Sequence, residues 1–268
     1  MRGIRLRQMI TAAGLALAGV ALAGCAGESS LAEVLQSAGA VPVSSTTSAG
    51  NSEFNPFAEP SGTVTPARKV IQNPTLADVL KPGPLPEMAL GRADAPVTIV
   101  KYASLTCPYC RKFHLETFPQ LKREYIDTGK VRFILREFPI GFQSGAATIA
   151  LRCAPPERYF ELYGKFLQQQ AKWVSQEVRL DPIFKIASQV GMTRAQFDAC
   201  YENQGMINAL KEVKERGRTL GVIGTPNFFI NDRLVKTVIG MEEIRAMVEP
   251  LLAAHSGRLA AKDHSHSE

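Results

Sequence analysis

Two short apolar runs, joined by a stretch with helical spacing, constrain the fold of this chain more than any other feature. Residues 96–102 (PVTIVKY) and 131–138 (VRFILREF) are rich in β-branched and aromatic residues, which is typical of strands. The stretch between them ends near Gly129, and Pro119 inside it should kink or interrupt the helix. Two strands joined through a helix predict a βαβ unit with parallel strands. The helical stripe consists of Phe113, Phe118, Leu121 and Tyr125.

The remaining pattern extends this unit into an α/β domain over residues 75–254. Residues 144–220 have helical patterns throughout and predict a helical insertion. Within it, Thr193 and Gln196 have the spacing of a capping box that opens a helix. The last predicted elements are a strand at 227–230, a turn at Asn231, a strand at 234–239 and a helix at 241–254.

The first 24 residues have the parts of an export signal. Three arginines (Arg2, Arg5 and Arg7) precede an apolar run at residues 9–24, which is short for a membrane-spanning helix. The run leads into Leu-Ala-Gly-Cys, which resembles the bacterial lipobox, where the cysteine, here Cys25, is lipidated. Ordinary cleavage after Ala23 is the alternative. We therefore expect an exported protein, held by lipid on the periplasmic side of a bacterial membrane.

Two segments, residues 25–74 and 255–268, lack the periodicity of folded structure. The first is rich in Ala, Ser, Thr, Gly and Pro and predicts a flexible tether, which would span roughly 40 Å. The second predicts a disordered polar tail, whose three histidines make a weak metal site. The net charge of +6 lies partly in the first residues, and no basic stripe is interleaved with aromatics, so no nucleic-acid partner is predicted.

Cys107 and Cys110 form a Cys-x-x-Cys pair where the first predicted strand ends and the helix begins. A reactive dithiol needs one exposed, ionised thiol, and the unpaired N–H groups at a helix start stabilise a thiolate. Between the cysteines lie Pro108, which suits a first helical turn because it has no N–H, and Tyr109. The two residues after the pair are basic. The pattern predicts a redox pair with Cys107 as the attacking sulfur.

Two metal-based interpretations compete with the redox pair. A zinc site usually has four ligands, and the chain has no second Cys-x-x-Cys, although His114 could be a third ligand. Packing or solvent exposure is the simpler role for that histidine. Haem attachment requires His directly after the second cysteine, where Arg111 stands. The redox interpretation is therefore favoured.

Over roughly residues 75–254, the chain resembles the DsbA family of the thioredoxin superfamily. The resemblance is carried by APVTIV leading to CPYC at 107–110, GKVRF from Gly129, REFP from Arg136 and GTPNFF from Gly224, in that order. It implies an α/β structure with the thioredoxin fold and an inserted helical domain. It further implies that Cys107 forms the mixed disulfide with substrate and that Cys110 resolves it.

The same resemblance implies that Pro226 follows a cis peptide and faces the dithiol. Thr225 would then offer backbone hydrogen bonds to an extended substrate, which is a way to bind many sequences weakly. From the residues alone, an ordinary trans proline at the start of a strand is equally compatible with the pattern.

Lys101 is a departure from the family pattern. Thioredoxin-like proteins often carry a buried acid six residues before the first cysteine, and here that position is a lysine. A charged lysine cannot accept a proton, but it would favour a nearby thiolate and so modulate a thiol pKa. The alternatives are a Lys101 beneath Cys110 and a Lys101 whose ammonium extends to the surface.

Cys153 and Cys200 both fall in the predicted helical insertion. Some DsbA relatives carry a second, structural disulfide there, so the resemblance implies a Cys153–Cys200 bond in an oxidising compartment. A loop of about 50 residues would stabilise the fold by a few kcal/mol. The alternatives are two buried free thiols, and a regulatory bond that tunes the potential of the active site.

The function expected from these features is that of an extracytoplasmic thiol:disulfide oxidoreductase. It would introduce disulfides into exported proteins that bear thiols, and a DsbB-like membrane protein would reoxidise it, with no cofactor of its own. The first alternative is an isomerase or reductase that uses the same site. The second is a non-enzymatic chaperone or copper-binding lipoprotein, because thiolates suit copper(I).

Overall fold

The computed structural model describes residues 69–265. The predicted signal segment, Cys25 and residues 25–68 of the predicted tether lie outside the described residues. The first helix, α1 (Leu76–Leu80), begins where the folded part was predicted to start. Its N-cap Thr75 accepts a hydrogen bond from the backbone of Asp78, whose carboxylate accepts from the Thr75 backbone, so a capping box opens the domain.

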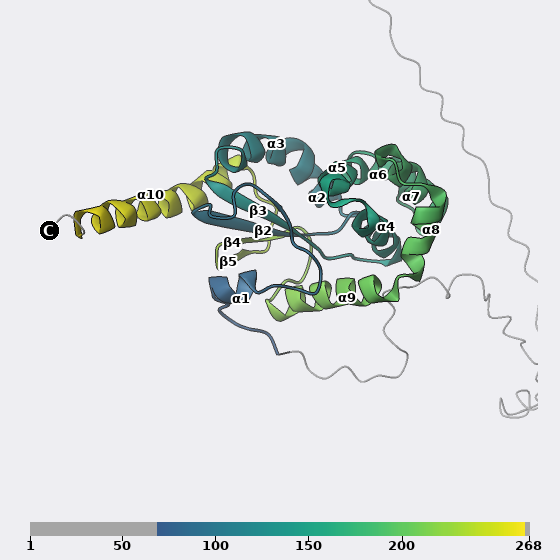
Figure 1. The fold of residues 1–268 in the computed structure, drawn as a ribbon, viewed down its shortest axis with the longest axis horizontal. Helices are drawn as coiled ribbons and strands as arrows, with labels where there is room; N and C mark the ends of the chain where they lie inside the picture. Colours follow the sequence, from purple (N-terminus) through teal and green to yellow (C-terminus); the bar gives the residue numbers. More distant parts are fainter. Residues whose placement is uncertain (1–68, 266–268) are drawn as a thin grey trace, which may run out of the picture. The chain divides into compact units, whose positions relative to one another are not determined.

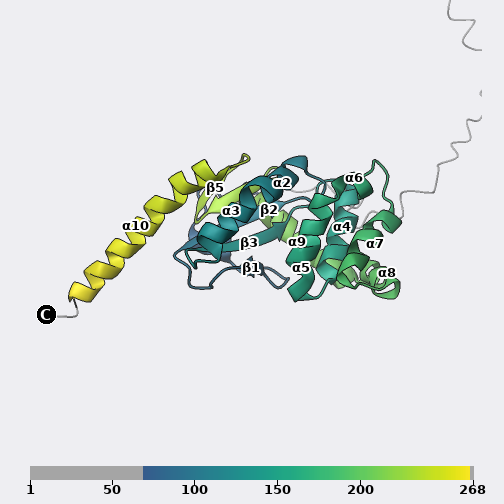
Figure 2. The same cartoon turned by 90° about the horizontal axis from the view of Figure 1, so that it is seen from above.

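A five-stranded sheet with the order β1-β3-β2-β4-β5 organises the domain (Figures 1 and 2). Strands β2 (Val97–Ala103) and β3 (Val131–Glu137) are parallel, which confirms the predicted βαβ unit. Strand β4 (Asn227–Ile230) pairs antiparallel with β2. The edge strand β1 (Met88–Leu90) was not predicted, because three residues are too few to show a period. The other edge, β5 (Arg233–Val235), is shorter than the predicted strand at 234–239.

The connection between β2 and β3 is one irregular helical run. Its first part, α2 (Pro108–Lys112), follows Cys107 directly. Pro119 lies in a short α-helical segment between two π-helical turns, and the chain stays helical on both sides of it, so the helix is irregular here without being broken. The later parts are η1 (Phe113–Thr117), α3 (Phe118–Leu121) and η2 (Lys122–Ile126).

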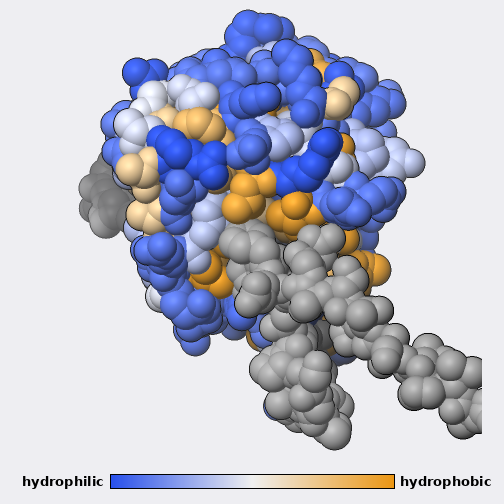
Figure 3. All heavy atoms as spheres, turned by 90° about the vertical axis from the view of Figure 1, so that its right-hand side faces the viewer, coloured by the Kyte–Doolittle hydropathy of each residue, from blue (hydrophilic) through white to orange (hydrophobic). Residues whose placement is uncertain are grey.

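A block of helices follows β3 and gathers beside the carboxyl end of β2, while its last helix runs along one face of the sheet (Figure 1). The predicted capping box is confirmed: Thr193 accepts from the backbone of Gln196, whose side chain accepts from the Thr193 backbone. The outward end of the block is mostly hydrophilic, with small apolar patches (Figure 3). The helices are α4 (Phe142–Cys153), η3 (Pro156–Arg158), α5 (Tyr159–Gln168), α6 (Gln170–Trp173), α7 (Leu180–Ala187), η4 (Ser188–Val190), α8 (Arg194–Glu202) and α9 (Gln204–Thr219).

Strand β2 is buried along its whole length because both faces of the sheet are covered. On one face, Val100 and Tyr102 pack in a cluster with Val79 of α1. On the other face, Ile99 and Ala103 belong to the main core. Side chains alternate between the faces of a strand, so Lys101 must enter the same core as Ile99 and Ala103. The topology therefore determines where this one charged residue of β2 lies.

The C-terminal helix is longer than predicted. Helix α10 (Met241–Ser265) continues through most of residues 255–268, so the prediction of a disordered tail there is wrong for residues 255–265. The stretch from Leu259 to Ala261 consists of strong helix formers and has no proline stop, which explains the extension. Figures 1 and 2 show its last part extending away from the sheet. Within residues 69–265, no helix is sufficiently long and apolar to cross a bilayer.

Candidate active site

Cys107 is the N-cap of helix α2, as the sequence predicted. Its backbone is extended, and its sulfur accepts a hydrogen bond from the backbone N–H of Cys110 at 3.4 Å. Pro108 occupies the first helical position, where no N–H is required. The end of β2 and the start of α2 thus present one sulfur to the first turn of a helix. In this structure both Cys107 and Cys110 are free thiols.

The environment of Cys107 strongly favours its thiolate. Hydrogen bonding from the Cys110 side chain is the largest cause and acts, with contributions from the backbone N–H groups of Cys110 and Tyr109, to lower the pKa of Cys107 to about 5. Partial burial opposes this shift. A thiol with this pKa is mostly ionised at neutral pH, and the thiolate is the form that attacks a disulfide.

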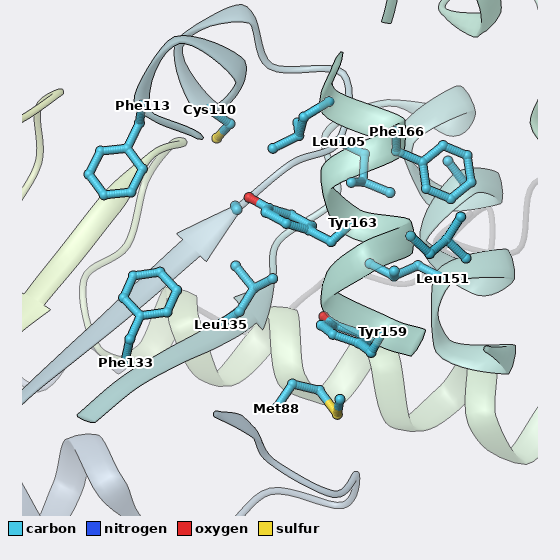
Figure 4. Close-up of a cluster of buried hydrophobic side chains, with 14 of the residues drawn as sticks. Met88, Leu105, Cys110, Phe113, Phe133, Leu135, Leu151, Tyr159, Tyr163 and Phe166 are labelled. Carbon is cyan, nitrogen blue, oxygen red and sulfur yellow. The ribbon is translucent and has the colours of Figure 1, made fainter. Parts of the chain in front are cut away.

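Cys110 has the opposite environment. Its side chain is fully buried, and burial together with the neighbouring Cys107 raises its pKa well above the ordinary range. Figure 4 shows Cys110 at the edge of the buried cluster, with Phe113 from the same helical run and Tyr163 from α5 beyond it. The two sulfurs are therefore unequal: Cys107 is accessible and ionised, whereas Cys110 is shielded and protonated.

The Thr225–Pro226 peptide is cis and lies against the cysteine pair. The sulfur of Cys107 is 3.1 Å from the carbonyl oxygen of Thr225, which accepts a hydrogen bond from the protonated form of the thiol. The antiparallel register of β2 and β4 pairs Tyr102 with Asn227, so the residues before β4 reach the end of β2 where Cys107 begins the helix. The hydroxyl of Thr225 is buried without a hydrogen-bond partner among the described residues.

Lys101 lies in the interior beside the dithiol, so the alternative in which its ammonium extends to the surface is wrong. The residue is 1% exposed, and its Nζ donates to the hydroxyl of Tyr163 at 3.2 Å. The same nitrogen lies 4.4 Å from the centre of the Phe113 ring. Burial lowers the pKa of Lys101 to about 8, while Cys110 and then Cys107 oppose that shift. The sequence provided no signal for Tyr163 as its partner.

His114 packs in the core instead of extending toward a ligand. Its ring stacks on Phe118 with centroids 5.5 Å apart, and it meets Tyr163 edge-on at 5.6 Å. Burial, followed by the charge of Lys101, lowers the pKa of His114 to about 4, so the ring is neutral at pH 7. In the part of the chain that the structure describes, no group of three or more metal-ligating side chains occurs.

A disulfide joins Cys153 at the end of α4 to Cys200 in α8, with an S–S distance of 2.05 Å. Cys200 belongs to a small buried cluster with Ile149 and Ile207, and Cys153 packs against it. The bond thus ties two helices of the insertion together and is separate from the Cys107–Cys110 pair.

Gln170, in helix α6, is a further residue at the site, and the sequence provided no indication of it. Its side-chain amide donates to the carbonyl of Leu105 at 2.7 Å and to that of Cys107 at 3.1 Å. No local pattern distinguishes it from the neighbouring glutamines. Several large apolar side chains in or next to the segments that form the site are exposed, namely Tyr109, Ile140, Phe142 and Ile223.

Comparison with known proteins places this site in a family. The sequence model of the family described as "Thioredoxin" matches residues 85–250. A Rickettsia bellii protein named "Putative protein-disulfide oxidoreductase" is 33% identical over 147 residues, which cover 54% of this chain and 57% of the relative. A Bacillus anthracis protein named "Probable disulfide bond formation protein D" is 29% identical over 156 residues, which cover 55% of this chain and 71% of the Bacillus protein.

The structure of this chain is similar to the crystal structure of alpha-DsbA1 from Wolbachia pipientis, with a TM-score of 0.63 and 26% sequence identity. That match covers 69% of this chain and 100% of the Wolbachia chain. The match to the Rickettsia bellii relative covers only 57% of its length, and that to the Rickettsia conorii relative 62%.

The sheet order, the inserted helices and the dithiol at a helix N-terminus beside a cis-proline define the DsbA-like class of thioredoxin-fold proteins. The match over residues 85–250 covers more than half of the sequence. This chain therefore belongs to the thioredoxin family.

Proposed function

We propose that this chain is a thiol:disulfide oxidoreductase that introduces disulfides into exported proteins through Cys107 and Cys110. The observation that carries the proposal is the asymmetry of the pair. The sulfur of Cys107 is accessible, has a pKa lowered to about 5 and touches the Thr225 carbonyl, whereas Cys110 is buried with a raised pKa. One sulfur can therefore meet a substrate while the other is kept from it.

The exchange proceeds in two steps. A substrate thiolate attacks the sulfur of Cys107 in the Cys107–Cys110 disulfide, the S–S bond breaks, and Cys110 leaves with the electron pair. A second thiolate of the substrate then attacks the substrate sulfur of the mixed disulfide, and Cys107 leaves as a thiolate. The substrate dithiol loses two electrons to the enzyme, and its two protons go to Cys110 and to solvent.

The electrostatics of Cys107 favour the oxidising direction. Hydrogen bonds that lower the pKa of Cys107 stabilise the reduced enzyme, and a stable reduced form makes the disulfide a strong oxidant. An isomerase or reductase with the same site is the alternative, and the reduction potential distinguishes the two. The reduced enzyme would be reoxidised by a DsbB-like membrane protein.

Substrate contact is expected at the Thr225–Pro226 turn and the apolar residues around it. The Thr225 backbone lies beside Cys107, where it can offer hydrogen bonds to an extended chain. Tyr109 and Ile223, which are 59% and 78% exposed, supply apolar contact to unfolded segments. Such contacts are weak and tolerant of sequence, as an enzyme with many substrates needs.

The proposed location is the periplasmic side of a bacterial membrane. The basic start, the apolar run and the Leu-Ala-Gly-Cys sequence that ends at Cys25 support export and a lipid anchor. The Cys153–Cys200 disulfide is consistent with an oxidising compartment.

The deciding experiment measures the reduction potential of the Cys107–Cys110 pair in glutathione buffers, together with oxidation of a reduced model protein. A potential near about −120 mV and rapid oxidation are expected, whereas a potential near about −270 mV would indicate a reductant instead. The matched control is Cys107→Ser, which should abolish oxidation. A wild-type protein that leaves substrate thiols unchanged but retains stoichiometric copper(I) would contradict the proposal and favour metal binding.

A further inference from the structure

A buried ammonium group without an acidic partner lies next to the dithiol. Lys101 is 1% exposed, and within the described part of the chain no carboxylate lies at ion-pair distance from its Nζ. Removing a charge from water without pairing it is costly, so such a group persists only where something else compensates or where it has a role.

Two neutral aromatic side chains hold the Lys101 ammonium in place. Its Nζ lies 4.4 Å from the centre of the Phe113 ring, which supplies a cation–π contact, and it donates to the Tyr163 hydroxyl at 3.2 Å. Phe113 comes from the helical run after the cysteines, whereas Tyr163 comes from helix α5 of the insertion. The ammonium of Lys101 is therefore contacted by side chains from two separate parts of the fold, η1 and α5. Neither contact supplies negative charge.

The titratable groups that interact with Lys101 come from three elements. Cys107 and Cys110 are at the start of α2, His114 is in η1, and Tyr163 is in α5. His114 is neutral, because burial and Lys101 lower its pKa to about 4. Burial raises the pKa of Tyr163 well above its ordinary value, so its hydroxyl is neutral too. Among residues 69–265, the groups that can present a negative charge to Lys101 are therefore the two sulfurs.

Of the two sulfurs, Cys110 is the one whose thiolate depends on the Lys101 ammonium for stabilisation. Burial and the neighbouring Cys107 both disfavour the Cys110 thiolate, and Lys101 is the largest influence that opposes them. Cys107 instead accepts hydrogen bonds from Cys110 and the first helical turn. The helix N-terminus thus stabilises one thiolate, and the buried lysine is available for the other.

We propose that Lys101, held by Tyr163, stabilises the thiolate of Cys110 whenever the Cys107–Cys110 disulfide opens or closes. This inference rests on the proposed function. In the oxidising direction, the S–S bond breaks and Cys110 leaves as a thiolate beside the Lys101 ammonium. In the reverse direction, Cys110 loses its proton, its thiolate attacks Cys107 in the mixed disulfide, and the departing substrate thiolate takes up a proton. At pH 7, below its pKa of about 8, Lys101 stays charged in both directions and acts as a positioning residue.

The test follows the step in which Cys110 alone reacts. The full chain is reduced, Cys107 is converted to its mixed disulfide with glutathione, and release of glutathione by Cys110 is timed from pH 5 to 10. The variants are Lys101→Met, which removes the charge at similar volume, and Tyr163→Phe, which removes the hydrogen bond. The matched control is Lys130→Met. This exposed lysine also lies over an aromatic ring, 5.5 Å from the centre of Tyr125, but it precedes β3 at the opposite end of the sheet.

Lys101→Met should move the pH profile of glutathione release to higher pH by at least about one unit, which slows release about tenfold at pH 7. Tyr163→Phe should shift the profile in the same direction by a smaller amount, and Lys130→Met should leave it unchanged. The pKa of Cys107, read from thiolate absorbance, should move less than that of Cys110 in Lys101→Met. A loss of packing alone would not separate the two sulfurs in this way.

A folded Lys101→Met protein with the wild-type pH profile would overturn the inference, as would an equal shift in Lys130→Met. If Lys101→Met does not fold, Tyr163→Phe decides: an unshifted profile overturns the inference. Failure of the proposed function is a separate result, since it would be seen as absence of thiol oxidation by the wild-type protein. Wild-type oxidation with unshifted variants would contradict only the role of Lys101.

Discussion

The side chain of Gln170 donates a hydrogen bond to the backbone carbonyl of Cys107 at 3.1 Å. The donor lies in helix α6 of the insertion, and the acceptor caps the helix that carries the dithiol. The same amide holds the carbonyl of Leu105 at 2.7 Å. One buried side chain of the insertion therefore satisfies two carbonyls in the loop that leads to the reactive sulfur, and this links the two parts of the fold at the site.

Replacing Gln170 by Leu should destabilise the protein and disturb the site. Two carbonyls in the loop lose their donor, which costs about 1–3 kcal/mol for a buried group left unsatisfied. Chemical denaturation measures the loss, and the alkylation rate of Cys107 shows whether the loop has moved. Gln168→Ala, at an exposed position of α5, is the control and should change neither quantity. Equal stability of Gln170→Leu and wild type would show that water replaces the amide.

The stability of the reduced protein should depend on pH through Cys107. Its folded pKa is lowered to about 5, below that of an unfolded cysteine, so the thiolate stabilises the folded state. This contribution is complete above the unfolded pKa, declines as pH falls, and is lost below about 5. Thermal unfolding of the reduced protein between pH 4 and 9 checks this.

The control for that titration is Cys107→Ser, which should lack this part of the pH dependence. The rate of alkylation of the reduced wild-type protein should rise with pH around the same pKa of about 5. A titration near the ordinary value for cysteine would refute the assigned electrostatics.

Cys110→Ser should trap substrates on Cys107 as mixed disulfides. Without the buried thiol, no second sulfur of the enzyme can displace the substrate from Cys107. Non-reducing electrophoresis of cells that express the variant should show adducts that disappear on reduction. Cys107→Ser should show none, because the remaining sulfur of Cys110 is buried. Adducts of equal abundance in the two variants would mean that the roles are wrongly assigned.

Removing the Cys153–Cys200 disulfide should lower stability without changing the dithiol. The two cysteines are 47 residues apart, and a loop of this length corresponds to about 4 kcal/mol in the chain-entropy model. Denaturation of a Cys153→Ala/Cys200→Ala protein measures this loss against wild type. An unchanged reduction potential of the Cys107–Cys110 pair is expected, whereas a shifted potential would support the regulatory alternative.

Cys25→Ser should release the protein from membranes. Cys25 follows Leu-Ala-Gly at the end of the apolar run, and lipid attachment requires its thiol. Fractionation of cells into membrane and soluble parts measures the change, with a buried-thiol variant such as Cys110→Ser as the control. Membrane retention of Cys25→Ser at the wild-type level would exclude anchoring through this cysteine.

Local patterns predicted much of the fold correctly. The β-branched runs coincide with β2 and β3, and the capping box at Thr193 opens α8, since each depends on neighbouring residues. Strand β1 was missed because its three residues acquire a strand conformation only by pairing with β3. The length of α10 was underestimated because a polar, charged composition conceals strong helix propensity.

At the candidate site, local sequence was enough to predict the dithiol, because a proline after Cys107 and a strand before it place that sulfur at a helix start. Tertiary structure alone decided what surrounds it. Thr225 is 118 residues away from Cys107, and Tyr163 is 62 residues away from Lys101, yet each pair is in hydrogen-bond contact. Burial depends on which sheet face a helix covers, and no local pattern encodes that. The charge of Lys101 could therefore be read from the sequence, but its place beside the two sulfurs could not.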